Sequence, residues 1–196
     1  MIHLIHGFRE LHPIGDPRIS TALKNRLLQR GDAVTVHDYG YLDLVGVKCN
    51  RNLARLIRPS VKRGDTLVGF SNGCAIIAHL QTMKSIACPK IVLIQPALAQ
   101  KWTPNKHCAS IDVYYNSGDK ATVAGKWWRR VINVLPWRWQ ARHMWGEMGH
   151  DGYTGKDLRF TQYDTENTPG MPRLSGHGTW QHAKSTIWQD FIAARI

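Results

Sequence analysis

A serine stands between two glycines in the run Gly69-Phe70-Ser71-Asn72-Gly73. An apolar run with strand character, 66–70, precedes it, and an apolar helical pattern, 74–83, follows it. A serine in this context lies on a sharp turn that lifts its hydroxyl above the edge of a sheet. Glycine meets the steric demand of close strand–helix packing, and the helix N-terminus favours negative charge. The pattern therefore predicts a nucleophile at Ser71; the alternative is a Gly-Ser-Asn loop without chemistry.

A serine hydroxyl becomes a good nucleophile when a base removes its proton, and an imidazole base works best when a carboxylate orients it. Asp119 follows the strand-like run 111–115, and His177 lies in Ser175-Gly176-His177-Gly178, just before a C-terminal helical pattern. The chain order Ser71, Asp119, His177 is the one expected of a hydrolase with a mostly parallel sheet. These three residues are the predicted catalytic group.

The elements that must position these residues alternate along the chain. We predict strands at 2–5, 33–37, 66–70, 90–95, 111–115 and 159–163 and helices at 16–30, 53–61 (kinked near Pro59), 74–83, 121–135 and 179–194. Strands that are apolar on both faces and separated by helices indicate a parallel sheet covered on both sides. Reactive groups in such sheets gather at the carboxyl ends of the strands. The segment 98–110 is predicted to be too short and too interrupted by proline for a crossover helix.

Four motifs together resemble the α/β-hydrolase superfamily: Leu4-Ile5-His6-Gly7-Phe8, Gly69-Phe70-Ser71-Asn72-Gly73, Gly118-Asp119-Lys120-Ala121-Thr122 and Gly176-His177-Gly178-Thr179-Trp180. The resemblance implies three layers, with helices on both faces of a mostly parallel sheet. The sheet is expected to have about six strands, because the first two strands of the family look absent. By position, Ser71 would be the nucleophile, His177 the base and then the acid, and Asp119 its orienting carboxylate. The oxyanion hole would be formed by the backbone amides of Phe8 and Asn72.

Other residues compete for these roles. His182 falls inside the predicted last helix, away from the strand-end loops, and His150 lies in an irregular region where no family pattern places a base. Asp112 begins a strand and would lie at the wrong end of the sheet. Asp151 and Asp164 are weaker alternatives in the irregular region.

The resemblance also implies a small-molecule substrate, a carboxylic ester or thioester, cleaved through an acyl-enzyme without a cofactor. Amide hydrolysis and acyl transfer on the same residues stay open. The segment 146–155 is predicted to line the entrance of the pocket. The residues proposed for the pocket itself are His6, Trp145, Met148, His150 and Tyr153.

A basic and aromatic segment supports a rival interpretation. The 26 Lys and Arg outnumber the 14 Asp and Glu, which gives a formal charge of +12, and no acidic residue falls between 120 and 146. That span holds Lys120, Lys126, Arg129, Arg130, Arg138 and Arg142, interleaved with Trp127, Trp128, Trp137, Trp139 and Trp145. Such a mixture could bind single-stranded nucleic acid or an anionic membrane surface. The rival is a non-catalytic scaffold that binds nucleic acid or an acidic partner; alternatively, the tryptophans pack a cap over the pocket.

Composition narrows the class of protein. The 196 residues fit one α/β-hydrolase-like domain, 1–196, with a Trp/Arg-rich irregular cap or insertion at about 126–172. No apolar run reaches the roughly 20 residues of a membrane span, and no secretion signal is visible. Four cysteines without metal-ligand spacing indicate reduced thiols, so a cytoplasmic location is expected. The sequence shows neither metal-site nor nucleotide-binding motifs.

Overall fold

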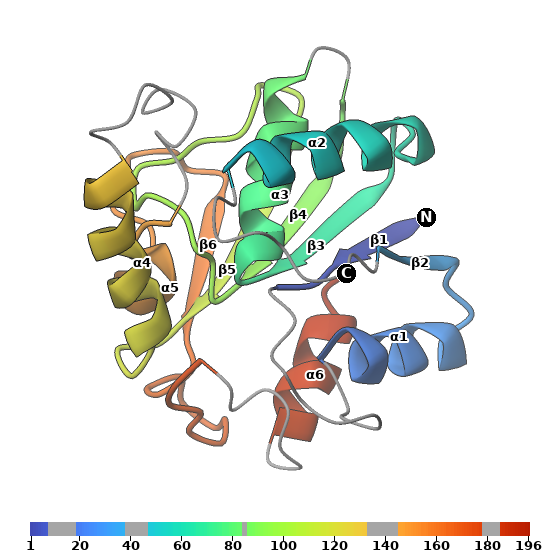
Figure 1. The fold of residues 1–196 in the computed structure, drawn as a ribbon. Coiled ribbons are helices and arrows are strands. Elements are labelled where there is room, and N and C mark those ends of the chain that lie inside the picture. Colours follow the sequence, from blue (N-terminus) through green and yellow to red (C-terminus); the bar gives the residue numbers. More distant parts are fainter. Residues whose placement is uncertain (8–18, 38–46, 84–85, 133–144, 178–184) are drawn as a thin grey trace, which may run out of the picture.

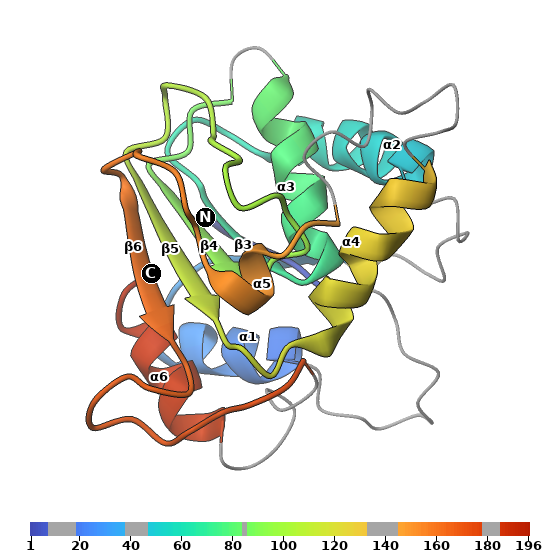
Figure 2. The same cartoon turned by 90° about the vertical axis from the view of Figure 1, so that its left-hand side faces the viewer.

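A single sheet of six parallel strands forms the centre of the molecule (Figures 1 and 2). The computed structural model describes residues 1–7, 19–37, 47–83, 86–132, 145–177 and 185–196, with only the backbone at 19–21, 47–49, 128–129 and 131–132. The strands are β1 (Ile2–Ile5), β2 (Val34–His37), β3 (Thr66–Phe70), β4 (Lys90–Ile94), β5 (Ser110–Tyr115) and β6 (Phe160–Asp164). Their order in the sheet is β2-β1-β3-β4-β5-β6. Each of the six predicted strands is present, with bounds within one residue.

Helices cover both faces of the sheet, as the three-layer prediction requires. They are α1 (Ile19–Gln29), α2 (Val47–Ile57), α3 (Asn72–Thr82), α4 (Lys120–Ile132), α5 (Met148–Asp151) and α6 (Thr186–Ala193). In Figures 1 and 2, α1 and α6 lie together on one face, and α2 and α3 lie on the other. The predicted kink near Pro59 is a short 3-10 helix, Arg58–Ser60, that follows α2 directly.

The sheet separates two apolar cores. On one face, α3 and strands β3 to β5 bury a large cluster that includes Ile77, Leu80 and Leu93. On the other face, Leu27 of α1 and Trp188 of α6 pack against strand side chains such as Leu4 and Val92. Because both faces are covered, the strands are apolar on both sides, which is why their sequence signal is continuous.

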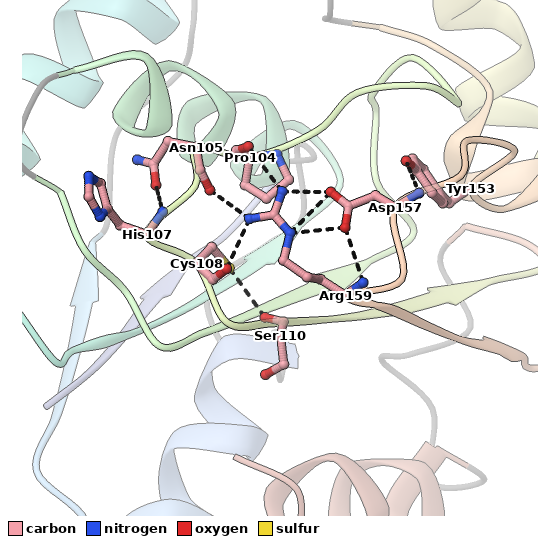
Figure 3. A network of polar contacts seen from close by, with 8 residues as sticks. All are labelled: Pro104, Asn105, His107, Cys108, Ser110, Tyr153, Asp157 and Arg159. Atoms are coloured by element: carbon pink, nitrogen blue, oxygen red, sulfur yellow. Dashed lines mark hydrogen bonds and ion pairs between the residues drawn. The ribbon is translucent and has the colours of Figure 1, made fainter.

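The connection from β4 to β5 has no helix, as predicted for 98–110. Arg159, at the start of β6, fixes this connection by donating to the carbonyl oxygens of Asn105 at 2.7 Å and Cys108 at 2.9 Å (Figure 3). The carboxylate of Asp157 accepts from the same guanidinium at 2.6 Å. This network holds together the segments that precede β5 and β6. It therefore lies at the amino ends of these strands, opposite the carboxyl ends where Asp119 and His177 follow.

Polar contacts at β1 tie three neighbouring strands together. A ring nitrogen of His3 lies 2.9 Å from Nε2 of His37, and its other ring nitrogen lies 3.0 Å from the carboxylate of Asp65. Burial, reinforced by the charge of His3, lowers the pKa of His37 to about 4, so His37 is neutral at neutral pH. These contacts fix β1, the strand that leads into His6 and Gly7.

The described thiols are buried, which disfavours their thiolate forms. Cys74, Cys88 and Cys108 are buried and free, and burial raises the pKa of Cys88 to about 12 and of Cys108 to about 11. Within the described ranges, no three His, Cys, Asp or Glu side chains are grouped as metal ligands would be. Each described helix is too short or too polar to cross a bilayer.

Candidate active site

The turn between β3 and α3 holds Ser71 in an unusual backbone conformation, with φ 52° and ψ −117°. The glycines two residues before and after it have no room for side chains. A Cβ added at Gly73 would lie 2.0 Å from the carbonyl oxygen of Ile5, and one added at Gly69 would lie 2.7 Å from Cδ1 of Ile77. The glycines are therefore required by the close approach of α3 to β1 and β3, as the sequence predicts. The strained φ is of the kind that clusters at functional sites.

Hydrogen bonds hold this turn on the neighbouring strand. The amide of Ser71 donates to the carbonyl of Ile94 at 2.9 Å, and the carbonyl of Ser71 accepts from the amides of Cys74 at 3.1 Å and Ala97 at 3.2 Å. Ser71 is only 8% exposed. The hydroxyl is thus carried on a rigid backbone at the carboxyl edge of the sheet.

His177 contacts both Ser71 and Asp119. Its Nε2 lies 2.7 Å from Oγ of Ser71, and its Nδ1 lies 2.9 Å from each carboxylate oxygen of Asp119. Because an ionised carboxylate only accepts hydrogen bonds, Nδ1 carries the proton and Nε2 is left to accept from the serine hydroxyl. The ring of Phe70 stacks on the imidazole, with centroids 5.3 Å apart. The structure therefore brings the three predicted catalytic residues together in the order that general-base chemistry needs.

Asp119 is fully buried in the loop after β5. The amide of Thr122 donates to its Oδ1 at 3.1 Å. Gly149 lies directly against it, since a Cβ there would be 2.9 Å from Oδ2. The carboxylate is thus held by a hydrogen bond from the first turn of α4 and by close contact with Gly149 of α5.

Asn72, one of the two residues predicted for the oxyanion hole, is the first residue of α3. Its side chain forms a reciprocal amide pair with Asn50 of α2, at 2.7 and 3.0 Å, and both residues are fully buried. The helix N-terminus places positive partial charge beside the serine. Phe8, the other predicted donor, lies outside the described residues. Sequence reasoning missed Asn50, because nothing in the periodicity of α2 indicates a partner across the core.

The predicted pocket residues divide into two groups. His6 is 5% exposed, and its Nδ1 donates to the carbonyl of Gly7 at 2.8 Å, next to the serine turn. Trp145 and Met148 are buried, and their amides donate to the carbonyls that follow β4, of Ala97 at 2.7 Å and Leu98 at 3.0 Å. His6 therefore lies beside the nucleophile turn, and Trp145 and Met148 lie against the loop that follows β4.

The other two pocket residues have different neighbours. His150 is partly exposed and pairs with Asp151. The Tyr153 ring stacks on Phe160 at 3.7 Å, and its hydroxyl accepts from the amide of Asp157, beside the Arg159 network (Figure 3). The structure places Tyr153 with the start of β6, and none of its described contacts is with Ser71, Asp119 or His177.

The rival acids have partners of their own. Asp112 pairs with Lys90 at 2.9 Å, at the amino-terminal side of the sheet. Asp151 pairs with His150 and accepts from Gln100. Asp164 accepts from the side chain of Asn167 in the turn after β6. None of these three carboxylates has a described contact with Ser71 or His177, and His182 lies outside the described residues.

The basic and aromatic segment is not uniform. Trp145 is 4% exposed, and the backbone of Gly125 in α4 packs against it. Trp127, on the outer side of α4, is 67% exposed, and Arg130 one turn later is also exposed. Lys126 pairs with Glu147. Trp145 therefore packs beside the site, whereas Trp127 and Arg130 face solvent; residues 133–144 lie outside the described ranges.

Two residues beside the site directly follow strands. Because reactive groups gather at the carboxyl ends of parallel strands, this position could have indicated both residues. Gln95 follows β4, Asn116 follows β5, and both side chains reach the residue before His177. Sequence reasoning missed both, because it searched these loops for nucleophiles, bases and acids and passed over neutral amides.

The fold resembles that of known structures over nearly the whole chain. A protein of Xanthomonas campestris pv. campestris that is assigned to the alpha/beta hydrolase superfamily has a TM-score of 0.50 and 19% identity, with 98% of each chain covered. Alpha/beta hydrolase domain-containing protein 10 from mouse has a TM-score of 0.55 and 13% identity, with 99% of this chain and 88% of the mouse chain covered. No family model and no curated protein matches the sequence. The chain has the α/β-hydrolase fold that its motifs predict.

Proposed function

We propose that the protein is a serine hydrolase that cleaves a carboxylic ester or thioester through an acyl-enzyme. The observation that carries the proposal is the continuous contact from Ser71 Oγ to Nε2 of His177, at 2.7 Å, and from Nδ1 to the carboxylate of Asp119, at 2.9 Å. A hydroxyl, an imidazole and a buried carboxylate in this arrangement perform nucleophilic acyl transfer on several unrelated folds.

The reaction follows from the hydrogen bonds. Nε2 of His177 takes the hydroxyl proton as Ser71 attacks the acyl carbon, and Asp119 stabilises the resulting imidazolium. The imidazolium then protonates the leaving alcohol or thiol, and the acyl group stays on the serine. Water, deprotonated by the same Nε2, attacks the acyl-enzyme and releases the acid. Esters and thioesters are the proposed substrates because an alcohol or a thiol leaves more readily than an amine.

The developing oxyanion needs fixed donors. The amide of Asn72 is a candidate, since it lies at the N-terminus of α3, immediately after the nucleophile. One such donor contributes about 3 kcal/mol to transition-state stabilisation. The Asn50–Asn72 amide pair would keep this donor in place while the acyl carbon changes geometry.

A serine-reactive fluorophosphonate probe tests the proposal. We expect the wild-type protein to be labelled and to hydrolyse nitrophenyl esters or acyl thioesters, and we expect Ser71→Ala to abolish both. Ser60→Ala is the matched control, because Ser60 is exposed at the end of the 3-10 helix Arg58–Ser60 and its hydroxyl donates to the carbonyl of Ile57, away from His177. The proposal would be refuted if folded wild-type protein is not labelled by the probe and cleaves neither nitrophenyl esters nor acyl thioesters.

A second candidate function is favoured by the exposure of Trp127. An exposed tryptophan with Arg130 one turn away can stack on a base and neutralise a phosphate. We expect a single-stranded oligonucleotide to quench tryptophan fluorescence at low salt, and its affinity to fall steeply as salt rises. Trp127→Ala should weaken binding, whereas Leu158→Ala, which removes a fully exposed apolar side chain elsewhere, should not. Absence of binding at low salt would eliminate this function.

A further inference from the structure

The backbone of Gly176, the residue before His177, is held from two sides. Its carbonyl oxygen accepts a hydrogen bond from Nε2 of Gln95 at 2.8 Å, and its amide donates to Oδ1 of Asn116 at 3.0 Å. The carbonyl belongs to the peptide bond that joins Gly176 to His177. Gly176 has φ 93°, a conformation that L side chains rarely adopt. The two side chains therefore fix both peptide planes that lead into the candidate base.

Gln95 and Asn116 are polar residues at positions where burial and backbone conformation are expected to destabilise the fold. Both are fully buried, and Gln95 has φ 45°, which is uncommon for a residue other than glycine. Their hydrogen bonds to Gly176 fix which end of each amide points at the backbone, since only the NH2 donates and only the oxygen accepts. In the described part of the chain, Oε1 of Gln95 and Nδ2 of Asn116 have no hydrogen-bond partner. Buried polar groups left unpaired and strained backbone both destabilise the fold, and both recur at functional sites.

A carboxylate ties the loop of His177 to the loop of Asp119. Glu166, whose side chain is 4% exposed, accepts from the hydroxyls of Ser117 and Ser175, and these hydrogen bonds lower its pKa. The two loops also touch directly, because a Cβ at Gly118 would lie 2.1 Å from Oγ of Ser175. The base and its acid are thus carried on loops that are held together as one unit. Gln95 links these two loops to β4. The carbonyl oxygen of Ile94, the last residue of β4, accepts a hydrogen bond from the amide of Ser71.

We infer that Gln95 and Asn116 are positioning residues that set the distance between His177 and Ser71 by clamping the backbone of Gly176. The inference rests on the proposed function for its effect on catalysis. Gln95 extends from the end of β4, which also anchors the nucleophile turn, so one strand end fixes both the serine and the base. Without these two hydrogen bonds, the loop that carries His177 can shift, and the imidazole shifts with it relative to the hydroxyl of Ser71. Misplacement of a reacting group by about 1 Å can lower the rate by about 100-fold.

The main test is Gln95→Met, which keeps the length of the side chain and removes the donor. We expect kcat on a nitrophenyl ester to fall by about 10- to 100-fold with KM changed less than twofold, because the side chain of Gln95 is fully buried and does not face the solvent from which substrate binds. The matched control is Gln100→Met, in which the lost donor serves the side chain of Asp151 and has no described contact with His177. Its kcat should equal that of the wild type.

A second readout does not need activity. A proton held between Nδ1 of His177 and the carboxylate of Asp119 gives a low-field signal in proton NMR, which His177→Gln would assign by its loss. We expect this signal to shift or broaden in Gln95→Met and to stay unchanged in Gln100→Met. If the wild type neither hydrolyses esters nor takes up the probe, the proposed function fails, yet the NMR signal still decides whether the clamp positions His177.

A third variant, Gln95→Glu, keeps the size of the side chain if Gln95→Met fails to fold. An ionised carboxylate repels the carbonyl of Gly176, whereas a protonated carboxyl can donate to it, and burial raises the pKa of such a carboxyl. The ratio of variant to wild-type kcat should therefore rise as the pH falls. Folded variants with wild-type kcat, a flat ratio and an unmoved NMR signal would overturn the inference.

Discussion

Asp119→Asn is expected to lower kcat for ester hydrolysis by about 10⁴-fold while the fold is retained. The reason lies in the two donors that face the carboxylate. The amide of Thr122 already donates to Oδ1, so the oxygen of an asparagine would remain there and its NH2 group would face Nδ1 of His177. That NH2 would donate to Nδ1, and the proton of the imidazole would move to Nε2. His177 would then present a donor to Ser71 and could not take its proton.

The measurement is kcat with a nitrophenyl ester near neutral pH, together with the rate of fluorophosphonate labelling. Asp151→Asn is the control, because Asp151 is the acid partner of His150 and Gln100 and has no described contact with His177. It should leave both rates unchanged. A folded Asp119→Asn protein with more than a tenth of the wild-type kcat would contradict the assignment of Asp119, and an inactive Asp151→Asn protein would favour the rival carboxylate.

Gly73→Ala is expected to destabilise the protein by about 3 kcal/mol or more, through overpacking against backbone that cannot yield. The added Cβ would lie 2.0 Å from the carbonyl oxygen of Ile5 and 2.8 Å from that of His6. Ile5 ends a strand that is paired on both sides, with β2 and β3. Relief would need α3 to move away from the sheet, and the nucleophile turn with it. For a chain of this size the melting temperature should fall by roughly 6–12 °C.

Gly125→Ala is the matched control for this steric argument. Gly125 is inside α4, and the nearest atom to an added Cβ is Cβ of Trp145 at 3.5 Å, an ordinary contact. Alanine is preferred over glycine by about 1 kcal/mol inside a helix. We expect Gly125→Ala to raise the melting temperature by roughly 2–4 °C. Thermal unfolding of both variants checks the pair, and changes of the same sign would contradict the close-approach argument.

Sequence periodicity predicted the strands well because each is a short apolar run that is buried on both faces. It predicted α2 poorly. The helix begins at Val47, six residues before the expected start at 53, and the extra turns carry Asn50, a polar residue whose place is explained only by its pairing with Asn72. That contact joins residues 22 positions apart in the chain and is invisible to any local pattern.

The candidate site shows the same division. Ser71, Asp119 and His177 could be singled out because each residue type has recognised chemistry and each lies in a loop at the carboxyl edge of a parallel sheet. Glu166 could not be, since its part depends on where the Ser117 and Ser175 loops meet in space. Tyr153 belongs to the segment 146–155 that is predicted to line the pocket entrance, and the stacking of its ring on Phe160 could not be read from the sequence, because it depends on where the start of β6 lies in space.

The three candidate catalytic residues are spread along the chain, with His177 lying 106 residues after Ser71 and 58 after Asp119. Protein synthesis runs from the N-terminus, so the serine and its turn leave the ribosome long before the imidazole exists. Until then the serine has no base, and the loop that will carry the base has not yet met Gln95 and Asn116. The growing chain therefore holds an unactivated hydroxyl. Under the proposed function, the serine becomes a reactive nucleophile only after β6 and the loop that carries His177 have been synthesised.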